Sequence, residues 1–577
     1  MDIQKQIKKD LEKTIIKVFG DKVNVDKIYL EIPEDSKYGD YSSNFALIKF
    51  SDILMPNIKT PLVMAQKIAG NFPEKDYLQK IEAISPGFIN LYIKPKFFIP
   101  VLNKILKNKD QYGSNKIGKR KTVVIDYSAP NIAKPFSIGH LRSTIIGQAI
   151  YNLYKFSGYK AIGDNHIGDW GTQFGKLIVA IKKWSSVKKL PTLLIKDLVN
   201  LYIQFHKQAE EYPEFNKQAQ LWFKKLEKGD KEAKKIWQKC IDISWQEFNK
   251  IYDILDIKID YAFGESFYKN KTANLIKQAK KEGIAKKSQG ALIIEVNEKM
   301  PPLILLKSDG ATTYHTRDLA TIQFRTKKFK PCQIIYEVGA EQSLHFKQLF
   351  IAAQKFDWGK NIEYKHIAHG LMRLPSGKMS TRKGKIIFLE DILKQAIEKS
   401  FNIVEQNNPN MSFPEKQKLA KAIGVGAVKY NDLCQHYSKN IVFNWNKVLN
   451  LQGNSGPYIQ YTYTRALSIL RKARATQLAQ LKRLPDEKQI KTKEINILKH
   501  LSRFPEIVEK ATISHSPNLI CNYTFELCQK FNNFYETIPV LKAEDKKLQY
   551  RLVLVKSVTQ VIKNCLNLLG IEAIEKM

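Results

Sequence analysis

The stretch from Thr122 to Leu141 reads TVVIDYSAPNIAKPFSIGHL, and it decides how the rest of the chain is interpreted. Residues 122–127 are short and rich in β-branched side chains, as a buried parallel strand should be. A Ser-Ala-Pro-Asn loop follows, and the apolar spacing predicts a helix from Gly139 to Phe156, with Gly158 placed to end it. A strand that leads through a loop into a helix is the unit from which parallel α/β sheets are built.

The middle of the chain continues this alternation. Further strands are expected at 303–306, 334–338 and 366–368, and strands separated by helices imply a parallel α/β sheet. Residues 176–262 interrupt the alternation, because their apolar and aromatic side chains recur at helical spacing. This region is therefore predicted to be a helical insertion whose aromatic side chains face a core.

The two ends of the chain differ from the middle. Residues 1–112 predict a small α+β domain, with a first helix that ends at Gly20 and strands at 23–32 and 88–93. The basic, glycine-containing stretch 107–121 is interpreted as a linker. We therefore expect an α+β domain at 1–112, an α/β domain at 113–454 that carries the insertion at about 176–262, and an all-helical domain at 455–577.

The charge balance of the chain is strongly positive. It has 94 Lys and Arg residues against 56 Asp and Glu residues, which gives a formal net charge of +38. A large positive field favours polyanionic partners, and nucleic acid comes first among them. The alternative is a bias of the organism toward lysine, and the basic residues are spread too evenly for charge to locate a binding face. Because 44% of the residues are hydrophobic, a globally disordered protein is excluded.

The pattern of cysteines and the length of the apolar runs indicate in which cellular compartment the protein is expected. None of the six cysteines forms a C-x-x-C pair, and no Cys and His residues have zinc spacing, so neither a zinc site nor another metal site is expected. Sparse cysteines suit a reducing cytosol. The N-terminus lacks an apolar signal core, and no apolar run approaches the ~20 residues of a membrane helix. We expect a soluble cytoplasmic protein without a membrane partner.

A candidate phosphate site lies where the predicted helix begins. Helix N-termini present free N–H groups and the positive end of the helix dipole. Gly139 lets a nucleotide approach the backbone, and His140 can donate a hydrogen bond to a phosphate oxygen. The alternative interpretation is an ordinary strand-to-helix turn with a structural histidine, since the stretch contains neither a Walker A loop nor a G-x-G-x-x-G fingerprint.

A second candidate site is the basic loop Gly377–Gly384, which reads GKMSTRKG. Glycines on both sides allow the loop to move, and its Lys and Arg side chains can neutralise a departing pyrophosphate. Taken alone, the loop is better interpreted as a solvated basic surface segment.

The two sites together resemble the two signatures of class I aminoacyl-tRNA synthetases. The resemblance is to arginyl-tRNA synthetases in particular, and it continues in order along nearly the whole chain. It is carried by SAPNIAKPFSIGHLRST (128–144), GDWGTQFG (168–175), YHTRDLA (314–320), VGAEQSLHF (338–346), MSTRKG (379–384), NSGPYIQYTYTRA (454–466) and LGIEAIEKM (569–577).

This resemblance implies a Rossmann-type catalytic domain and a two-step reaction. The carboxylate of L-arginine would attack the α-phosphorus of ATP, and the 2′-hydroxyl of the terminal adenosine of tRNA(Arg) would then attack the arginyl-adenylate. Mg²⁺ would accompany ATP, and neither zinc nor a tightly bound organic cofactor is expected. The helical domain would bind the anticodon, the N-terminal domain would contact the tRNA elbow, and the family suggests a monomer.

The resemblance also assigns nucleotide-binding residues, with two departures. The first signature has Ser137 where the family has histidine, and the second has Thr381 where the family has its final lysine, a charge that Arg382 or Lys383 could supply. The catalytic residues would be Lys134, Ser137, Gly139, His140, Lys378, Ser380 and Lys383. The ATP-binding residues would be Pro130, Asn131, Ile138, Gly139, His140, Leu141, His369, Gly370, Lys378, Met379 and Ser380.

The arginine pocket follows in the same way. A guanidinium is planar with five donors, so it suits carboxylates and a hydroxyl acceptor. Tyr314 and Asp318 are four residues apart, which puts both on one face of a helix. Without the resemblance, this spacing would be read as an ordinary surface pair. The arginine-binding residues would be Asp126, Ser128, Asn131, Glu265, Tyr314, Asp318 and Gln342.

Two rival functions remain at this level. Another class I synthetase would activate a different amino acid, which pyrophosphate exchange would reveal. A catalytically inactive RNA-binding protein is suggested by Ser137 and Thr381, but such a protein would be expected to have lost His140, Lys378 or Asp318 as well, and all three are present.

Overall fold

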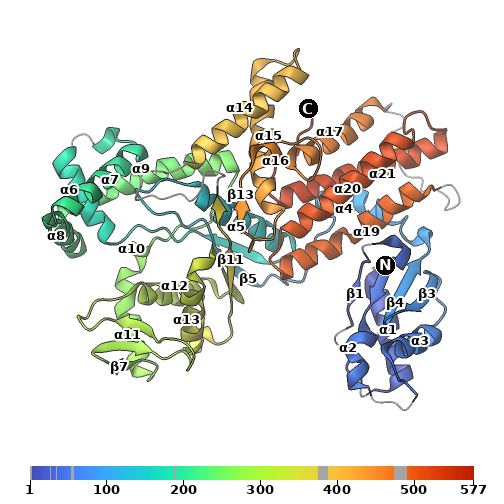
Figure 1. Ribbon diagram of the computed structural model, residues 1–577, viewed down its shortest axis with the longest axis horizontal. Helices are drawn as coiled ribbons and strands as arrows, with labels where there is room; N and C mark the ends of the chain where they lie inside the picture. Colours follow the sequence, from blue (N-terminus) through green and yellow to red (C-terminus); the bar gives the residue numbers. More distant parts are fainter. Residues whose placement is uncertain are drawn as a thin grey trace. The chain divides into compact units, whose positions relative to one another are not determined.

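The computed structural model describes residues 3–21, 23–25, 28–33, 35–53, 57–186, 190–373, 388–473 and 490–577 (Figure 1). The chain divides into two compact units. The first unit comprises Met1–Lys109, Ile469–Arg503 and Lys530–Val558, and the second comprises Asp110–Ser468, Phe504–Gln529 and Thr559–Met577.

The N-terminal part of the first unit is an α+β fold, as predicted. Its antiparallel sheet has the order β1-β2-β4-β3. Helix α1 buries Ile7, Leu11 and Ile15, the stripe that its periodicity predicts, and Gly20 follows it with a left-handed φ of +87°. The elements are α1 (Ile3–Phe19), β1 (Leu30–Glu31), β2 (Tyr41–Ser43), α2 (Phe45–Lys49), α3 (Pro61–Asn71), β3 (Leu78–Ile84), β4 (Phe88–Ile93) and α4 (Val101–Asn108).

One sequence prediction near this end was wrong in extent. The strand predicted at 23–32 is limited to Leu30–Glu31 among the described residues, because its partner β2 is itself only three residues long. The boundary between the two units lies between Lys109 and Asp110, within the stretch 107–121 that was interpreted as a linker, and in this stretch Tyr112 is buried and stacks on Phe504, with ring centroids 6.0 Å apart. Its apolar ring anchors the segment to the second unit.

The second unit is built on a four-stranded parallel sheet of order β11-β10-β5-β6. The strands are β5 (Thr122–Asp126), β6 (Lys160–Asp164), β10 (Gln333–Gly339) and β11 (Glu363–His369). Residues Val123, Val124 and Ile125 are fully buried, which explains the continuous β-branched run of β5. The parallel sheet predicted from the strand–helix alternation is confirmed.

The strand predicted at 303–306 is present, but its expected place in the parallel sheet was wrong. It is β9 (Leu303–Leu306), the edge of a separate antiparallel sheet with β7 (Lys286–Ser288) and β8 (Ala291–Ile294). This small sheet shares a core with one face of the parallel sheet and with α11 (Thr272–Lys281), α12 (Tyr314–Phe329) and α13 (Ser343–Gln354).

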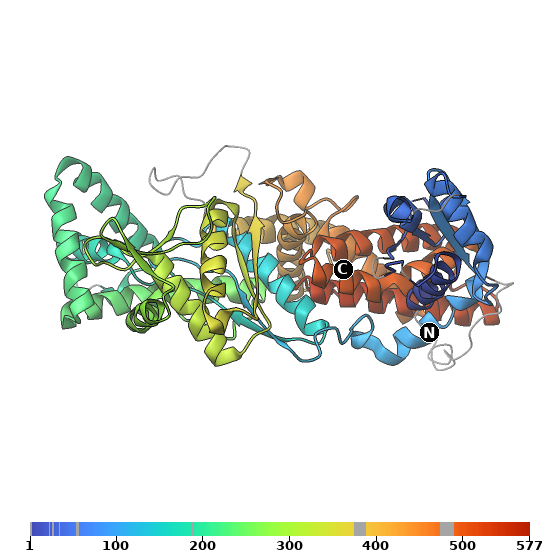
Figure 2. The same ribbon diagram turned by 90° about the horizontal axis from the view of Figure 1, so that it is seen from below.

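Helix α5 (Ile138–Phe156) follows the turn after β5 and packs closely on it. A Cβ atom at Gly147 would lie 2.2 Å from the Cβ atom of Tyr127, so this crossing requires glycine. The helical insertion is confirmed: α6 (Thr172–Trp184), α7 (Ile195–Glu211), α8 (Glu214–Lys228) and α9 (Lys231–Leu255) gather beside the sheet (Figure 2). Phe205 and Phe248 are buried in it, as expected of core aromatics.

From Gly456 to the end, the described residues are mainly helical, as predicted, whereas the long helices at Leu389–Asn407 and Phe413–Leu433 were not predicted. A hairpin of two long helices precedes the C-terminal helices. The remaining elements are α10 (Glu265–Tyr268), β12 (Met372–Arg373), α14 (Leu389–Asn407), α15 (Phe413–Leu433), β13 (Ile441–Val442), α16 (Trp445–Val448), α17 (Gly456–Lys472), α19 (Thr492–Ile513), α20 (Asn518–Thr537) and α21 (Asp545–Leu568). Within the described part of the chain, no helix has the length and apolar character needed to cross a membrane.

Candidate active site

The candidate site lies where the strands of the parallel sheet end. Ligands bind at this edge of open α/β sheets, in the crevice outside the carboxyl ends of the strands. The turn after β5 begins with Ser128 at φ +75° and Ala129 at φ +42°, a left-handed backbone that is costly for side chains other than glycine. The Ser128 N–H donates to Ser143 Oγ (3.0 Å), and the Ala129 N–H donates to Asn165 Oδ1 (2.9 Å). These bonds hold the strained turn in place.

The beginning of α5 fixes the tautomer of His140. The backbone N–H of Ser137 donates to His140 Nδ1 over 3.1 Å, and the Ser137 hydroxyl oxygen also lies 3.1 Å from this ring nitrogen. Since a backbone N–H can only donate, Nδ1 must be unprotonated, and the neutral ring carries its proton on Nε2. Burial, followed by the positive charge of Lys134, lowers the pKa of His140 to about 4. The ring is therefore a neutral donor at physiological pH.

The structure indicates a different reason for glycine at each of two predicted site positions, Gly370 and Gly139. A Cβ atom at Gly370 would lie 2.6 Å from the carbonyl oxygen of Lys439, so the fold itself requires glycine there. A Cβ atom at Gly139 would meet only Ser137 Oγ, at an ordinary 3.5 Å, and Gly139 is exposed. The open space in front of Gly139 leaves room for a nucleotide to approach the helix N-terminus, so the residues present fit ATP.

Arg142 ties α5 to the segment after β11. It is 1% exposed, and its Nε lies 3.1 Å from Asp432 Oδ1 and 3.2 Å from Oδ2. Its Nη1 donates to the carbonyl oxygens of Gly370 (2.6 Å) and Lys439 (2.7 Å), and its Nη2 donates to that of Tyr437 (3.1 Å). One guanidinium thus joins helix α5 to the segment after β11 and to the segment that follows α15.

His369 is held by a buried carboxylate. Its Nδ1 lies 2.9 Å from Oε1 of Glu337, which is fully buried in β10. Burial alone would lower the pKa of His369, but the charge of Glu337 outweighs burial and raises that pKa above its ordinary value. The charge that His369 carries when protonated is therefore balanced within the protein.

The predicted arginine-binding residues Tyr314 and Asp318 lie at the beginning of α12. Asp318 Oδ2 is 2.8 Å from His345 Nε2, and Oδ1 is 3.8 Å from His166 Nε2. Burial would raise the pKa of Asp318, yet the hydrogen bond and charge of His345 outweigh burial and lower it. Tyr314 is 56% exposed, with its ring centroid 5.1 Å from that of His345. The carboxylate is thus ionised beside an exposed phenol.

The other predicted arginine ligands occupy varied settings. Glu265 begins α10 and lies 3.6 Å from Arg317, and burial raises its pKa. Gln342 is exposed at the end of a short 3₁₀ turn, whereas Ser128 is 2% exposed, with its hydroxyl 2.8 Å from that of Tyr252. Asn131 bridges to Gly168.

Asp126 is held inside the protein. It is 3% exposed, and its Oδ2 lies 2.8 Å from Nη2 of Arg325. Burial raises the pKa of Asp126, and the guanidinium opposes that effect. Direct contact between Asp126 and arginine stays a prediction.

Several predicted site residues lie outside the described residues. These are Lys378, Met379, Ser380 and Lys383, together with Thr381 and Arg382 of the same loop. Of the predicted residues at the first signature, Pro130, Ile138 and Leu141 are buried, and Lys134 is partly buried. The part of the chain with described coordinates holds no group of three His, Cys, Asp or Glu side chains arranged for a metal ion.

The sequence did not predict several residues that form ion pairs with the predicted site residues or beside them. These are Arg142, His166, Arg325, Glu337, His345 and Asp432. His345 lies in the quoted stretch VGAEQSLHF, so proximity to a motif could have suggested it. The burial of Arg142 and Arg325 has no signal in sequence, because arginine in an amphipathic helix is normally exposed.

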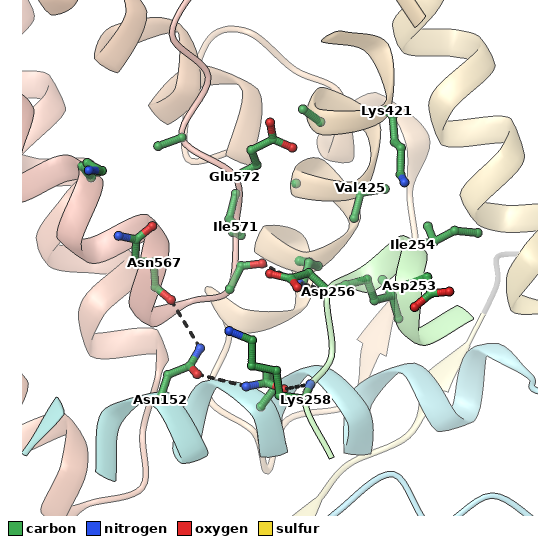
Figure 3. Close-up of a pocket in the computed structure, with 18 residues that line it drawn as sticks. Asn152, Asp253, Ile254, Asp256, Lys258, Lys421, Val425, Asn567, Ile571 and Glu572 are labelled. Atoms are coloured by element: carbon green, nitrogen blue, oxygen red, sulfur yellow. Dashed lines mark hydrogen bonds between the residues drawn. The ribbon is translucent and has the colours of Figure 1, made fainter. Parts of the chain in front are cut away.

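A cavity of about 550 Å³ lies in the same unit but away from these residues. It is lined by α5, the end of α9, α15 and the segment after α21, and Asn152 at its rim donates a hydrogen bond to the carbonyl oxygen of Asn567 (Figure 3). Lys429 lines it as a 1% exposed side chain that donates to the carbonyl oxygens of Leu255 (2.5 Å) and Gly570. Burial lowers the pKa of Lys429 to about 8.

Comparison with protein families gives three matches that together span most of the chain. Residues 2–93 match the arginyl tRNA synthetase N terminal domain. Residues 101–445 match the catalytic domain of class I tRNA synthetases (R), and residues 459–577 match the DALR anticodon binding domain.

Similar proteins and structures agree with these matches. The arginine–tRNA ligase of Halothermothrix orenii is 40% identical over 562 residues, covering 96% of this chain and 97% of that protein. The arginine–tRNA ligase of Clostridium kluyveri is 39% identical, and both chains are covered fully. The crystal structure of arginyl-tRNA synthetase from Plasmodium falciparum has a TM-score of 0.85 at 27% identity, covering 100% of this chain and 99% of that one. The arginyl-tRNA synthetase of Thermus thermophilus has a TM-score of 0.83 at 21% identity, covering 99% of this chain and 100% of the other, and shows the same fold.

Proposed function

The chain belongs to the arginyl-tRNA synthetase family, and on that premise we propose which of its residues carry the reaction. The protein is an arginine–tRNA ligase: it activates L-arginine with ATP and transfers it to the 3′-terminal adenosine of tRNA(Arg), releasing AMP and pyrophosphate. The predicted family and activity are thereby confirmed. The residue roles, the domain boundaries at 112 and 454, and the oligomeric state are the proposals that follow.

ATP binds at the beginning of α5 and beside His369. The free N–H groups of the helix N-terminus and the open face of Gly139 receive a phosphate group. His140 donates its Nε2–H to a phosphate oxygen, since its Nδ1 is occupied by the Ser137 N–H. Pro130, Asn131, Ile138, Leu141 and Gly370 shape this site, and Mg²⁺ arrives with the nucleotide.

Arginine binds between α12 and the neighbouring turns. Asp318 is the main acceptor for the guanidinium, because its lowered pKa keeps it ionised, and Tyr314 offers a hydroxyl from the same helix face. Glu265 and Gln342 complete the side-chain end of the pocket, and Ser128 and Asn131 face the α-amino end. Asp126 belongs to the site through its ion pair with Arg325.

Both chemical steps proceed by alignment and charge stabilisation. The arginine carboxylate attacks the α-phosphorus, and pyrophosphate leaves. The 2′-hydroxyl of the terminal adenosine then attacks the carbonyl carbon of the adenylate, and AMP leaves. No protein nucleophile takes part. The charge on the leaving pyrophosphate is stabilised by Lys134 and by the loop residues Lys378, Ser380 and Lys383. Position 381, where the family has a lysine, is threonine, and Lys383 or Arg382 supplies the missing charge.

The remaining proposals concern partners and place. The helical domain from 455 binds the anticodon, and Tyr461, which is 43% exposed on α17, is a candidate to stack on a base. The N-terminal domain contacts the tRNA elbow through its basic residues. We place the enzyme in the cytoplasm as a monomer. Its six cysteines are all unpaired, which supports a reducing compartment.

The arrangement of Asp318 carries the assignment of the arginine pocket, and the variant Asp318→Asn tests it. Loss of the charge is expected to raise the KM for arginine by about tenfold or more, because a hydrogen bond to a charged partner contributes roughly 1.5–3 kcal/mol. The KM for ATP should stay within about twofold, since ATP binds elsewhere. An unchanged KM for arginine in the aminoacylation assay would place the guanidinium elsewhere.

A further inference from the structure

Three polar side chains form a row across the parallel sheet, next to the arginine pocket. Tyr336 of β10 is in register with Asp126 of β5, and Asp126 is in register with Asp164 of β6. Residues in register on neighbouring parallel strands point to the same face of the sheet. The two carboxylates are 3% and 0% exposed, so their mutual repulsion is not screened by solvent.

Arg325 of α12 covers this row. Its Nη2 lies 2.8 Å from Asp126 Oδ2, its Nε lies 2.8 Å from Asp164 Oδ2, and its guanidinium carbon lies 5.3 Å from the centroid of the Tyr336 ring. The side chain is fully buried. A planar guanidinium can bridge two carboxylates through different nitrogens while it faces an aromatic ring, and a lysine ammonium cannot do so in the same geometry.

The position of Arg325 on its helix links the row to the substrate. Asp318 and Arg325 are seven residues apart, and Tyr314 lies four residues before Asp318, so all three share one face of α12. At 1.5 Å per residue, Asp318 is about 10 Å along the helix axis from Arg325. The two ion pairs fix both the rotation and the axial position of α12 on the strand ends, and these set where Asp318 and Tyr314 stand.

We propose that Arg325 is a positioning residue for the arginine pocket, clamping α12 to the ends of β5 and β6 so that Asp318 and Tyr314 meet the substrate guanidinium in the correct geometry. Asp126 then acts through this clamp and makes no contact with substrate. The internal guanidinium pairs with one oxygen of each carboxylate, Oδ2 of Asp126 and Oδ2 of Asp164. This inference rests on the proposed pocket at Asp318.

The test must separate positioning from stability. Arg325→Met alone would leave two buried carboxylates without a partner and would destabilise the fold. The combined variant R325M/D126N/D164N removes all three charges at nearly constant volume and is expected to restore the melting temperature. If Arg325 positions the pocket, this variant keeps a KM for arginine raised by about tenfold to a hundredfold, with the KM for ATP unchanged, because misplacement of about 1 Å has effects of this size.

The conservative variant Arg325→Lys keeps the charge but cannot bridge both carboxylates, so it should fold and still raise the KM for arginine. If the triple variant fails to fold, the KM of Arg325→Lys for arginine tests the positioning role by itself. A matched control is R551M/E494Q, which removes another buried pair, Arg551 Nε to Glu494 Oε1 at 2.8 Å, and should leave the KM for arginine unchanged.

A wild-type KM for arginine in a folded triple variant, or in Arg325→Lys, would overturn the proposal. So would an equal rise in the control, since the effect would then reflect general loosening of the protein. An unchanged KM in Asp318→Asn would instead overturn the proposed pocket, so the two failures are distinguishable.

Discussion

We predict that His140 remains neutral throughout the physiological range, with its proton on Nε2. The ring is partly buried, and burial together with Lys134 lowers its pKa to about 4. Relative to the ordinary value of 6.5, this corresponds to about 3 kcal/mol against protonation in place. About one molecule in a thousand would carry the imidazolium at pH 7. The geometry explains the preference, because protonated Nδ1 would face the Ser137 N–H donor.

The measurement is a histidine titration by NMR on ¹⁵N-labelled enzyme, with His140 assigned from the spectrum of His140→Gln. Nitrogen shifts distinguish the two neutral tautomers directly. The expected result is a pyrrole-type Nε2, a pyridine-type Nδ1 and no titration above about pH 5. A pKa near 6.5, or a proton on Nδ1, would refute the reasoning.

The same pKa has consequences for stability and for the variant Ser137→Ala. Because the folded-state pKa lies below the unfolded one, the contribution of His140 to stability is complete above pH 6.5 and is lost as pH falls toward 4. Ser137→Ala removes the hydroxyl but keeps the backbone N–H. It should therefore leave the tautomer intact and lower kcat by less than about tenfold. A change of tautomer in this variant would show that the hydroxyl, and not the backbone, sets it.

Two further predictions concern buried charges. Arg142→Met leaves Asp432 without its partner and should lower the free energy of unfolding of the second unit by about 3–5 kcal/mol in urea, with partial recovery in R142M/D432N; a loss below about 1 kcal/mol would contradict the network. The folded-state pKa of Lys429, about 8, lies below its ordinary value of 10.5. The free energy of unfolding of the wild type, relative to that of Lys429→Met, should therefore rise by about 3 kcal/mol as the pH increases from 8 to 10.5. Urea unfolding measures this difference, and a difference that does not change with pH would show that the ammonium is solvated.

The sequence predicted local features well and long-range ones poorly. Strand β5 and helix α5 were predictable because a buried strand and an amphipathic helix each have a characteristic hydrophobic pattern within a short stretch of sequence. The strand at 303–306 was also found, but its sheet was assigned wrongly, because pairing with β8 depends on contacts that periodicity does not encode. Short strands have the same limitation, as the two-residue strand β1 shows.

The candidate site divides in the same way. Gly139, His140, Tyr314 and Asp318 were proposed because they stand in recognisable motifs, whereas the partners that set their chemistry come from distant parts of the chain. Asp126 was predicted as an arginine ligand from the family resemblance, and no feature of residues 122–141 reveals that its carboxylate is also paired with Arg325. Motifs therefore indicate candidate substrate ligands, but they do not indicate which side chains hold those candidates in place.

The charges around the proposed nucleotide site indicate which residues could supply positive charge to the reaction. Arg142 is paired with Asp432, His369 with Glu337, and His140 is neutral. These three groups can position a triphosphate and donate hydrogen bonds to it, but they bring no net cation to a leaving pyrophosphate. We therefore propose that this charge comes from the lysines of the two signatures and from the Mg²⁺ that would accompany ATP. The chain can therefore tolerate serine at 137, because the residue before the helix orients the neutral imidazole through its backbone N–H, which every residue except proline has. The positive charge is then supplied by other groups of the proposed site.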